Sequence, residues 1–358
     1  MLQRGHEPGC SDIHFAVGVP PLLRLHGDLV PVEYHDLDND ELSELLRGML
    51  TEAQWETFAR GTDLDFSYDS EGLGRFRVNI FRTTSGIGAA FRVIPTQVPT
   101  LKSLGLPPVI THMTEVHTGC VLVTGATGMG KSTTLAAMLE HLNTTQPYNI
   151  ITLEDPIEFI HTSKRSLIVQ REVGTHMGSF AEGLRAALRE DPDVILVGEL
   201  RDADTIAMAL MAAETGHLVL GTLHTSSATK TLERLIDATP SEQQAQVTTT
   251  LVQTLRGVIS QTLVKTAGRR GRKAVVEVLV MTPAIGNLLT SGKIFQIPMQ
   301  LETGRNLGMQ LLDQALLEAV QKKELDPDDA YLRAQDKKLL QRFVTDPGLL
   351  PKISLVGA

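Results

Sequence analysis

Residues 119–139 read GCVLVTGATGMGKSTTLAAML and contain three structural signals in succession. Cys120–Thr124 is a short apolar run, which predicts a buried strand. A glycine-rich turn follows at Gly125–Ser132, and the apolar residues after it recur at the spacing of a helix. A strand, a glycine-rich turn and a helix in this order are the context in which a phosphate-binding loop occurs.

The turn has the full spacing of a P-loop, including the Lys-Ser pair at its end. Glycines allow backbone N–H groups to surround phosphate oxygens, and the helix N-terminus adds its positive dipole end. We expect Lys131 to contact the β- and γ-phosphates of ATP and the Ser132 hydroxyl to ligate Mg²⁺. The alternative is a strand–helix turn that needs glycine for its geometry alone. The predicted nucleotide-binding residues of the loop are Gly125, Ala126, Thr127, Gly128, Met129, Gly130, Lys131, Ser132 and Thr133.

Length and composition limit the class of protein. The chain has 358 residues, enough for two domains with separate cores, and its 42% hydrophobic content is typical of soluble globular proteins. A net charge of −9 argues against nucleic acid as the main partner. Cys10 and Cys120 are too few for a disulfide framework or a four-cysteine zinc site. Without a signal peptide or a membrane-spanning apolar run, we expect a cytoplasmic protein that reaches a membrane only through partners.

The first hundred residues predict a small α+β domain. Two strand candidates, Arg75–Arg82 and Gly88–Ile94, flank a turn. If this hairpin is centred at residues 84–85, Arg77 and Arg92 lie opposite each other on its polar face. Like charges in that arrangement are destabilising unless an anion lies between them. The two arginines therefore either bind an anion or belong to a solvated face.

Beyond residue 119, apolar strands alternate with helices, which predicts a mostly parallel sheet covered by helices. The expected strands are Asn149–Leu153, Val194–Val197 and Leu218–Leu223, and the expected helices between them are Phe180–Glu190 and Ala203–Glu214. We expect further helix over Glu242–Ser260, then a hairpin with the basic run Arg269–Lys273 at its turn. This run either contacts phosphate or is a solvated hairpin tip.

Three of these strands end in groups that suit phosphate chemistry, and ligands gather at the carboxyl ends of parallel strands. Glu154, Asp155 and Glu158 follow the first strand, Glu199 the second and His224 the third. Hydrolysis of ATP needs metal support, a residue that orients water, and cations for the developing charge. We expect Glu158 to orient water, Glu154, Asp155 and Glu199 to serve the metal, and His224 to sense the γ-phosphate. The alternative for the carboxylates is that they cap the following helices.

Four motifs resemble those of the secretion-ATPase superfamily, and in particular of its type IV pilus retraction (twitching motility) ATPases. They are GATGMGKST for Walker A, TLEDPIEF for the Asp box, ALREDPDVILVGELRD for Walker B and ETGHLVLGTLHTSSATKTLERLID for the His box. The resemblance implies a hexameric ring with a RecA-like P-loop ATPase core and a PAS-like N-terminal domain that closes over the nucleotide.

The resemblance also implies roles for single residues. Glu158 matches the catalytic glutamate of the family and Glu199 its Walker B glutamate. Arg77 and Arg92 match arginines that act on the phosphates. Two further cations that face the site in similar proteins correspond to Arg185 and Arg189.

The sequence departs from the family pattern at two places. Met129 stands where serine is common in the P-loop. The family stretch Ala-Ile-Arg-Asn-Leu-Ile-Arg-Glu appears here as Ala284–Ser291, with Gly286 and Thr290 in place of the two arginines. Glycine lowers helix preference by about 1 kcal/mol relative to alanine. Because this stretch lies outside the nucleotide motifs, we expect ATP hydrolysis to survive and coupling to the pilus machinery to change.

Together these observations predict an α/β protein with five segments. They are a PAS-like α+β domain at 1–94, a linker at 95–100, a RecA-like P-loop ATPase domain at 101–282, a helical C-terminal region at 283–345 and a mobile tail at 346–358. The expected function is that of a Mg²⁺-dependent, homohexameric ATPase for pilus retraction at the cytoplasmic face of the inner membrane. Its expected partners are the platform protein of the pilus and a paralogous retraction ATPase. The alternatives are an accessory paralogue, another motor of the superfamily, a nucleotide-binding regulator and a DNA translocase.

Overall fold

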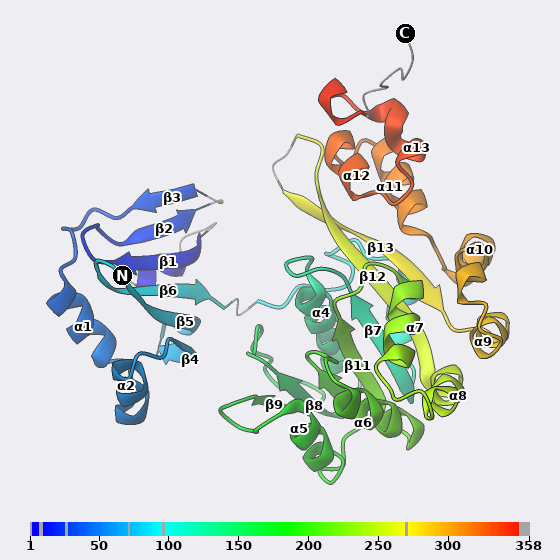
Figure 1. The fold of residues 1–358 in the computed structure, drawn as a ribbon, viewed down its shortest axis with the longest axis horizontal. Coiled ribbons are helices and arrows are strands. Elements are labelled where there is room, and N and C mark those ends of the chain that lie inside the picture. Colours follow the sequence, from blue (N-terminus) through cyan, green and yellow to red (C-terminus); the bar gives the residue numbers. More distant parts are fainter. Residues whose placement is uncertain are drawn as a thin grey trace. The chain divides into compact units, whose positions relative to one another are not determined.

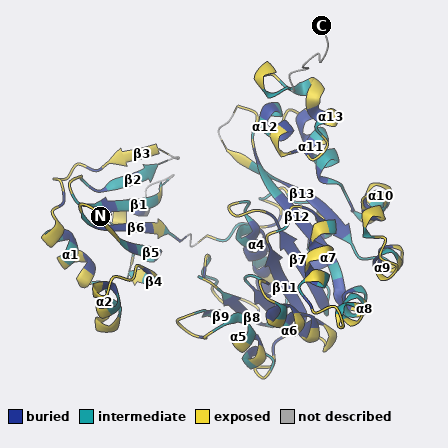
Figure 2. Cartoon of the chain, viewed as in Figure 1, coloured by how far each residue is buried: buried dark blue, intermediate teal, exposed yellow. Residues whose placement is uncertain are grey.

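The computed structural model describes residues 2–6, 10–25, 28–70, 72–94, 97–268 and 271–350. The chain forms two compact units (Figure 1). The first comprises residues 1–97 together with 156–160, and the second comprises residues 98–155 and 161–358. Buried side chains fill the interior of each unit (Figure 2).

The first unit contains a six-stranded antiparallel sheet with strand order β3-β2-β1-β6-β5-β4. Its strands are β1 (Cys10–Ala16), β2 (Leu22–Leu25), β3 (Asp28–Pro31), β4 (Leu64–Ser70), β5 (Gly74–Thr83) and β6 (Gly86–Val93). A 3₁₀ turn, η1 (Leu2–His6), precedes them, and the helices α1 (Asn39–Arg47) and α2 (Glu52–Ala59) lie between β3 and β4 in the chain. Phe76, Val78 and Ile80 point to one face of β5 because side chains alternate along a strand, and all three are buried. The predicted hairpin is confirmed, since Thr83 pairs with Gly86 across the turn.

The second unit is built on a seven-stranded sheet with strand order β13-β12-β7-β11-β10-β8-β9. Neighbouring strands pair in parallel from β12 to β9, whereas β13 pairs antiparallel with β12. The strands are β7 (Gly119–Thr124), β8 (Asn149–Glu154), β9 (Leu167–Glu172), β10 (Val194–Val197), β11 (Leu218–Leu223), β12 (Leu255–Lys265) and β13 (Arg272–Val280). The predicted α/β class with a mostly parallel sheet is therefore confirmed.

Helices cover both faces of this sheet. They are α3 (Pro108–Thr114), α4 (Lys131–Thr145), α5 (Phe180–Ala187), α6 (Ala203–Glu214), α7 (Ala228–Asp237) and α8 (Gln244–Thr254). Val121 and Val123 of β7 pack in one core with α3 and α4, whereas Cys120 and Leu122 pack in a second core with α5 to α8. Burial raises the pKa of the Cys120 thiol to about 12, so this cysteine is a structural residue, as the sequence predicted.

One predicted helix is wrong in its second half. The sequence predicted helix over Glu242–Ser260, but α8 ends at Thr254 and β12 begins at Leu255. Gly257 and the β-branched residues after it have poor helix preference. They also pair with β7 on one side and β13 on the other, so tertiary pairing decides a segment whose local pattern was ambiguous.

The C-terminal helices attach to the hairpin of β12 and β13. They are α9 (Pro283–Thr290), α10 (Ile297–Thr303), α11 (Leu312–Gln321), α12 (Pro327–Arg333) and α13 (Lys337–Leu340), with 3₁₀ turns η2 (Ile294–Gln296), η3 (Gly304–Leu307), η4 (Gln341–Phe343) and η5 (Pro347–Leu349). Lys265 at the end of β12 accepts a hydrogen bond from Asp326 N at 2.9 Å, and its own N–H donates to Asp329 Oδ2 at 2.7 Å. Of the basic run at this hairpin, Arg269 and Arg270 lie outside the described residues, and Arg272 begins β13.

Gly286 of α9 is buried against α8. A Cβ atom at this position would lie 2.9 Å from Cγ1 of Val252. The glycine thus permits close contact between the two helices. This packing explains its presence, although glycine lowers the helix preference of the segment. An arginine here would have to displace the Val252 side chain.

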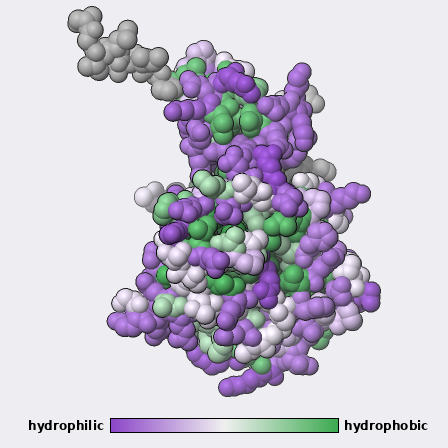
Figure 3. All heavy atoms as spheres, turned by 90° about the vertical axis from the view of Figure 1, so that its right-hand side faces the viewer, coloured by the Kyte–Doolittle hydropathy of each residue, from purple (hydrophilic) through white to green (hydrophobic). Residues whose placement is uncertain are grey.

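Apolar side chains also reach the surface of this unit. On the face that Figure 3 shows, they form patches among hydrophilic groups. Phe295 and Met299 are 74% and 66% exposed, and Leu307 in η3 is 49% exposed. Within the described residues, none of the helices combines the length and apolarity that crossing a bilayer requires.

Candidate nucleotide-binding site

The glycine-rich loop joins β7 to α4, as the sequence predicted. Gly125, Gly128 and Gly130 have φ angles of +146°, +77° and +79°, a region that other residues avoid. A Cβ atom at Gly125 would lie 2.4 Å from the backbone oxygen of Gln261, so no other residue fits there. The loop therefore has the backbone shape that cradles phosphate.

Lys131 begins α4 and points back into the loop. Its side chain is almost buried, and Nζ donates to the oxygen of Gly125 at 2.9 Å and to the oxygen of Ala126 at 3.2 Å. Ser132 and Thr133 are half-buried in the first turn of α4. A phosphate group entering the loop would compete with two neutral carbonyl oxygens for the ammonium group, and its negative charge gives it the advantage.

A second strand braces the loop from outside the motif. Gln261 of β12 is 5% exposed. Its Nε2 donates to Met129 O at 2.7 Å, and its Oε1 accepts from Thr134 Oγ1 at 2.7 Å. The sulfur of Met129 in turn accepts from Leu263 N at 3.4 Å. The methionine that departs from the family pattern thus ties the loop to β12.

Gln261 was not identified from the sequence, which placed it in a hairpin just after the expected helix Glu242–Ser260. It lies in the polar stretch Ser260–Thr262 between apolar residues, and polar side chains that are buried there need hydrogen-bond partners.

The ends of β10 and β11 bring Glu199 and His224 together. The carboxylate of Glu199 lies 3.3 Å from His224 Nε2 and 2.8 Å from Arg201 Nη2. On its other side, His224 Nδ1 lies 3.4 Å from Thr127 Oγ1 in the P-loop. His224 therefore bridges the P-loop and the predicted Walker B carboxylate, and Arg201 is a further partner that the sequence reasoning missed.

Glu154 ends β8 and is held by two neighbours. Its Oε1 accepts from Thr152 Oγ1 at 2.6 Å and from Gln170 Nε2 at 3.1 Å. Asp155 and Glu158 follow in an irregular segment and are exposed. The capping alternative is not supported, because the residues that cap the next two helices are Ser179 for α5 and Asp202 for α6.

Arg77 and Arg92 lie directly opposite each other on β5 and β6, as predicted. Arg77 makes two hydrogen bonds to Asp65 of β4, at 3.0 and 2.7 Å, and Arg92 donates to Asp12 Oδ1 of β1 at 3.0 Å. The arginine side chains are 37% and 67% exposed. Each of the two arginines thus pairs with a separate carboxylate. The sequence analysis had considered only a bound anion or a solvated face.

The remaining predicted residues have simpler surroundings. Arg185 on α5 and Arg189 just beyond its end are exposed, and neither side chain forms an ion pair within the described part of the chain. His217 lies before β11, where its Nδ1 is 2.9 Å from the oxygen of Ala212. This contact ties the imidazole to the last turn of α6.

A cavity of about 580 Å³ lies beside the end of the P-loop. It is lined by Gly130 and Thr133 from the loop and α4, by Leu104 and Leu263, and by Arg272 and Lys273 at the start of β13. This volume lies within the range of small-molecule sites, and the lining offers apolar surface next to a phosphate cradle. A second cavity of about 520 Å³, near Pro107 and Leu307, contains none of the motif residues.

The donor set fits Mg²⁺ bound together with a nucleotide. Among the described residues, no three His, Cys, Asp or Glu side chains form a group that could hold a metal by themselves. Mg²⁺ at nucleotide sites keeps several waters and takes only one or two protein carboxylates plus phosphate oxygens. The hydroxyl of Ser132 and the carboxylates of Glu199 and Glu154 are oxygen ligands of that kind.

Comparisons with known proteins agree with this geometry. Residues 70–324 match the family described as type II/IV secretion system protein. The chain is 47% identical over 335 residues to the type IV pilus retractation ATPase PilT of Pseudomonas aeruginosa, covering 94% of this chain and 97% of that protein. It is 46% identical over 318 residues to a twitching motility protein of Neisseria gonorrhoeae, covering 89% and 85%. A crystal structure of the pilus retraction motor PilT with bound ADP aligns with a TM-score of 0.87 at 41% identity, covering 93% of this chain and 96% of that one.

Proposed function

Because the chain belongs to the type II/IV secretion system protein family, we propose that it is a Mg²⁺-dependent ATPase that drives type IV pilus retraction and twitching motility. The strongest support is the contact chain Thr127–His224–Glu199, which joins the P-loop to a carboxylate at the neighbouring strand end. A relative named as the pilus retraction ATPase is similar in sequence to this chain over nearly the whole length of both proteins.

ATP binds with its phosphates in the loop and its nucleoside in the adjoining cavity. Backbone N–H groups of Gly128 to Ser132 surround the phosphates, and Lys131 exchanges its carbonyl partners for phosphate oxygens. Leu104 and Leu263 offer apolar contacts for the base, and Arg272 and Lys273 add positive charge at the rim.

Hydrolysis follows from the carboxylates around the loop. When bound, Mg²⁺ neutralises negative charge on the phosphates, and Ser132, Glu199 and Glu154 would hold it. Glu158 orients the attacking water and accepts its proton. Arg201 and His224 fix the direction of the Glu199 carboxylate. His224 also contacts Thr127, so that movement of the loop on γ-phosphate loss reaches Glu199 through one imidazole.

The arginine pair of the first unit supplies cations for the transition state. Arg77 and Arg92 form ion pairs with partly exposed carboxylates, and such surface pairs are worth about 0–1 kcal/mol. A phosphate group can therefore replace either carboxylate as a partner of its arginine. Delivery of the pair by closure of the N-terminal domain would couple hydrolysis to domain motion, and Arg185 and Arg189 would face the nucleotide as well.

The assembly that we propose is a homohexamer at the cytoplasmic face of the inner membrane. Its partners are the platform protein of the pilus and a paralogous retraction ATPase. The replaced arginines at Gly286 and Thr290 favour one alternative, an accessory retraction ATPase that works beside a second motor. The negative net charge of −9 makes a nucleic acid an unsuitable substrate.

Two measurements test this function. Purified protein should release phosphate from ATP in the presence of Mg²⁺, and Glu158→Gln should bind ATP but lose turnover by about 10²–10⁴-fold. The matched control is Glu56→Gln, an exposed glutamate on α2, which should behave as wild type. Expression in a strain that lacks its retraction ATPases should restore twitching. Normal turnover by Glu158→Gln would reject the proposed role of this carboxylate, and active enzyme without restored twitching would favour the accessory role.

A further inference from the structure

The segment that carries Glu158 is irregular, yet both of its ends are fixed. It leaves β8 at Glu154 and rejoins the sheet at Leu167, where β9 begins. Between these points the chain forms no helix and no strand. A carboxylate on such a segment can be held in a productive position only if the segment itself is anchored.

Gln170 of β9 contacts both ends of the part that contains Glu158. Its Oε1 accepts from the backbone N–H of His161 at 2.8 Å, and its Nε2 donates to Glu154 Oε1 at 3.1 Å. Parallel pairing of β8 and β9 places Gln170 beside Thr152, two residues before Glu154. One side-chain amide thus joins the residue before the segment Asp155–Ile160 to the residue after it.

The rest of the connection is anchored to the P-loop helix. Asn143 of α4 is fully buried; its Nδ2 donates to Thr162 O at 2.9 Å and its Oδ1 accepts from Lys164 N at 2.9 Å. Lys164 also forms an ion pair with Glu140, which lies on α4 one turn before Asn143. Residues 162–164 are therefore fixed to α4, and the two contacts of Gln170 hold Glu154 and His161 at the ends of 155–160.

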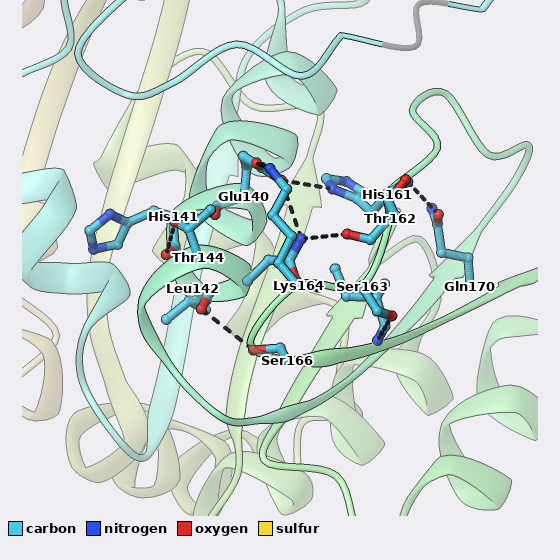
Figure 4. Close-up of polar contacts among 12 residues, drawn as sticks. Glu140, His141, Leu142, Thr144, His161, Thr162, Ser163, Lys164, Ser166 and Gln170 are labelled. Atoms are coloured by element: carbon cyan, nitrogen blue, oxygen red, sulfur yellow. Dashed lines mark hydrogen bonds and ion pairs between the residues drawn. The ribbon is translucent and has the colours of Figure 1, made fainter.

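The His161 side chain strengthens the distal anchor. It is only 3% exposed, and its Nδ1 lies 4.0 Å from Glu140 Oε2 (Figure 4). Burial lowers the pKa of His161, with Glu140 opposing and Lys164 adding to that effect. Because the His161 ring is buried, it limits movement of the His161 backbone. The backbone N–H that donates to Gln170 is therefore held in place.

We propose that Gln170 is a positioning residue that sets the placement of the Glu158 carboxylate by clamping both ends of the segment Asp155–Ile160. The inference rests on the proposed function, because it matters for turnover only if Glu158 acts on the attacking water. A misplacement of about 1 Å can cost 10²-fold in rate. The clamp itself is a separate statement about the segment and can be tested without any activity.

Gln170→Met tests the clamp with little change in volume, since methionine is unbranched and of similar length. We expect kcat to fall by about 10- to 100-fold, while KM and the Kd of a fluorescent ATP analogue stay within about twofold of wild type. The control is Ser163→Ala, which removes a different hydrogen bond to β9, from Ile168 N at 3.0 Å. It should lower melting temperature as much as Gln170→Met and leave kcat unchanged.

Hydrogen exchange separates the clamp from its catalytic consequence. The amide N–H of His161 donates to Gln170, so peptides that contain this amide should exchange about 2- to 10-fold faster in Gln170→Met than in wild type, as expected for loss of a side-chain hydrogen bond. Unchanged exchange in these peptides would overturn the clamp whatever the activity. Faster exchange with normal kcat, in a protein whose Glu158→Gln variant is inactive, would overturn the positioning role. If Glu158→Gln is active, faster exchange still supports the clamp and the failure belongs to the proposed function.

Discussion

The two charged regions of this molecule hold their groups in different ways. At the nucleotide site, Lys131 begins α4 just after the loop that follows β7, and Glu199 and His224 follow β10 and β11 of the same sheet. In the first unit, Arg77 and Arg92 rest on flanking carboxylates near the surface. The first arrangement is fixed by the core of the sheet. The second can exchange partners at little cost, which suits groups that are needed only when nucleotide is present.

The largest expected effect comes from the exchangeable region. Arg77→Ala and Arg92→Ala should each slow turnover by about 10³-fold, the lower end of the effect of arginine fingers in other P-loop enzymes. Melting temperature should change little, because the ion pairs of both arginines are exposed. Phosphate release and thermal melting measure the two quantities. Asp65→Asn is the control, since it removes the ion pair of Arg77 but keeps the arginine, and it should keep turnover. A large loss of melting temperature with normal turnover of the folded protein would make the arginines structural.

Lys131→Ala tests the fixed region. We expect nucleotide affinity to fall by about 1.5–3 kcal/mol, the value of a hydrogen bond to a charged group. Titration with a fluorescent ATP analogue measures the change. Lys164→Ala, a lysine of the same unit that contacts Glu140 and no part of the P-loop, is the matched control. Unchanged affinity in Lys131→Ala would mean that the lysine keeps its carbonyl partners when nucleotide binds.

Gln261→Leu asks whether the fixed region depends on β12. The change leaves Met129 O and Thr134 Oγ1 without their partner, so we expect a loss of about 1–2 kcal/mol in the free energy of unfolding. For a protein of 358 residues that is a fall in Tm of about 1–3 °C, readable by calorimetry. Gln253→Leu on the preceding helix is the comparison. An equal Tm for Gln261→Leu and wild type would show that the brace contributes nothing.

The smallest effect concerns Glu277, a carboxylate that the second unit holds at helix N-termini. It is 5% exposed and accepts a hydrogen bond from Ala228 N at 2.7 Å. Burial raises the pKa of Glu277, with the N–H groups of Ala228 and Leu312 opposing that shift. The folded state therefore binds this proton more tightly than the unfolded state does. Its contribution to stability falls as the pH rises through the interval between the unfolded and folded pKa values.

Glu277→Gln removes this titration. The Tm of the variant relative to wild type should rise by about 1 °C between pH 4 and pH 8, the effect of a fraction of a kcal/mol. Scanning calorimetry at several pH values gives the difference. A variant that loses Tm relative to wild type on going to pH 8 would show that the charged carboxylate is favoured by its two helix N-termini.

Much of the nucleotide site could be predicted because its residues are local in sequence or follow from sheet topology. The P-loop is one continuous motif, and Glu199 and His224 follow neighbouring strands whose carboxyl ends meet. The opposition of Arg77 and Arg92 followed from a short hairpin. These are short-range rules that a single sequence contains.

The parts that were missed depend on long-range pairing. Asp12 contacts Arg92 from 80 residues away, and no local pattern marks that pair. Gln261 reaches the P-loop from a strand whose apolar run fits helix or strand equally well until its neighbours are known. Gln170 is a polar residue on β9. Its contact with the N–H of His161 depends on how the irregular segment before β9 folds, which no local pattern predicts.

The strand β12 joins the nucleotide loop to the C-terminal helices, and this has a mechanical consequence. The Gln261 side chain donates to Met129 O in the P-loop. At the end of β12, the N–H of Lys265 donates to the Asp329 side chain of α12. Because β12 pairs with β7 over residues 255–260 and with β13 over residues 257–265, a pull along its axis strains many hydrogen bonds at the same moment rather than opening them one by one. Such a strand extends little under tension. A load applied to the C-terminal helices would therefore arrive at the phosphate cradle with little lost to stretching on the way.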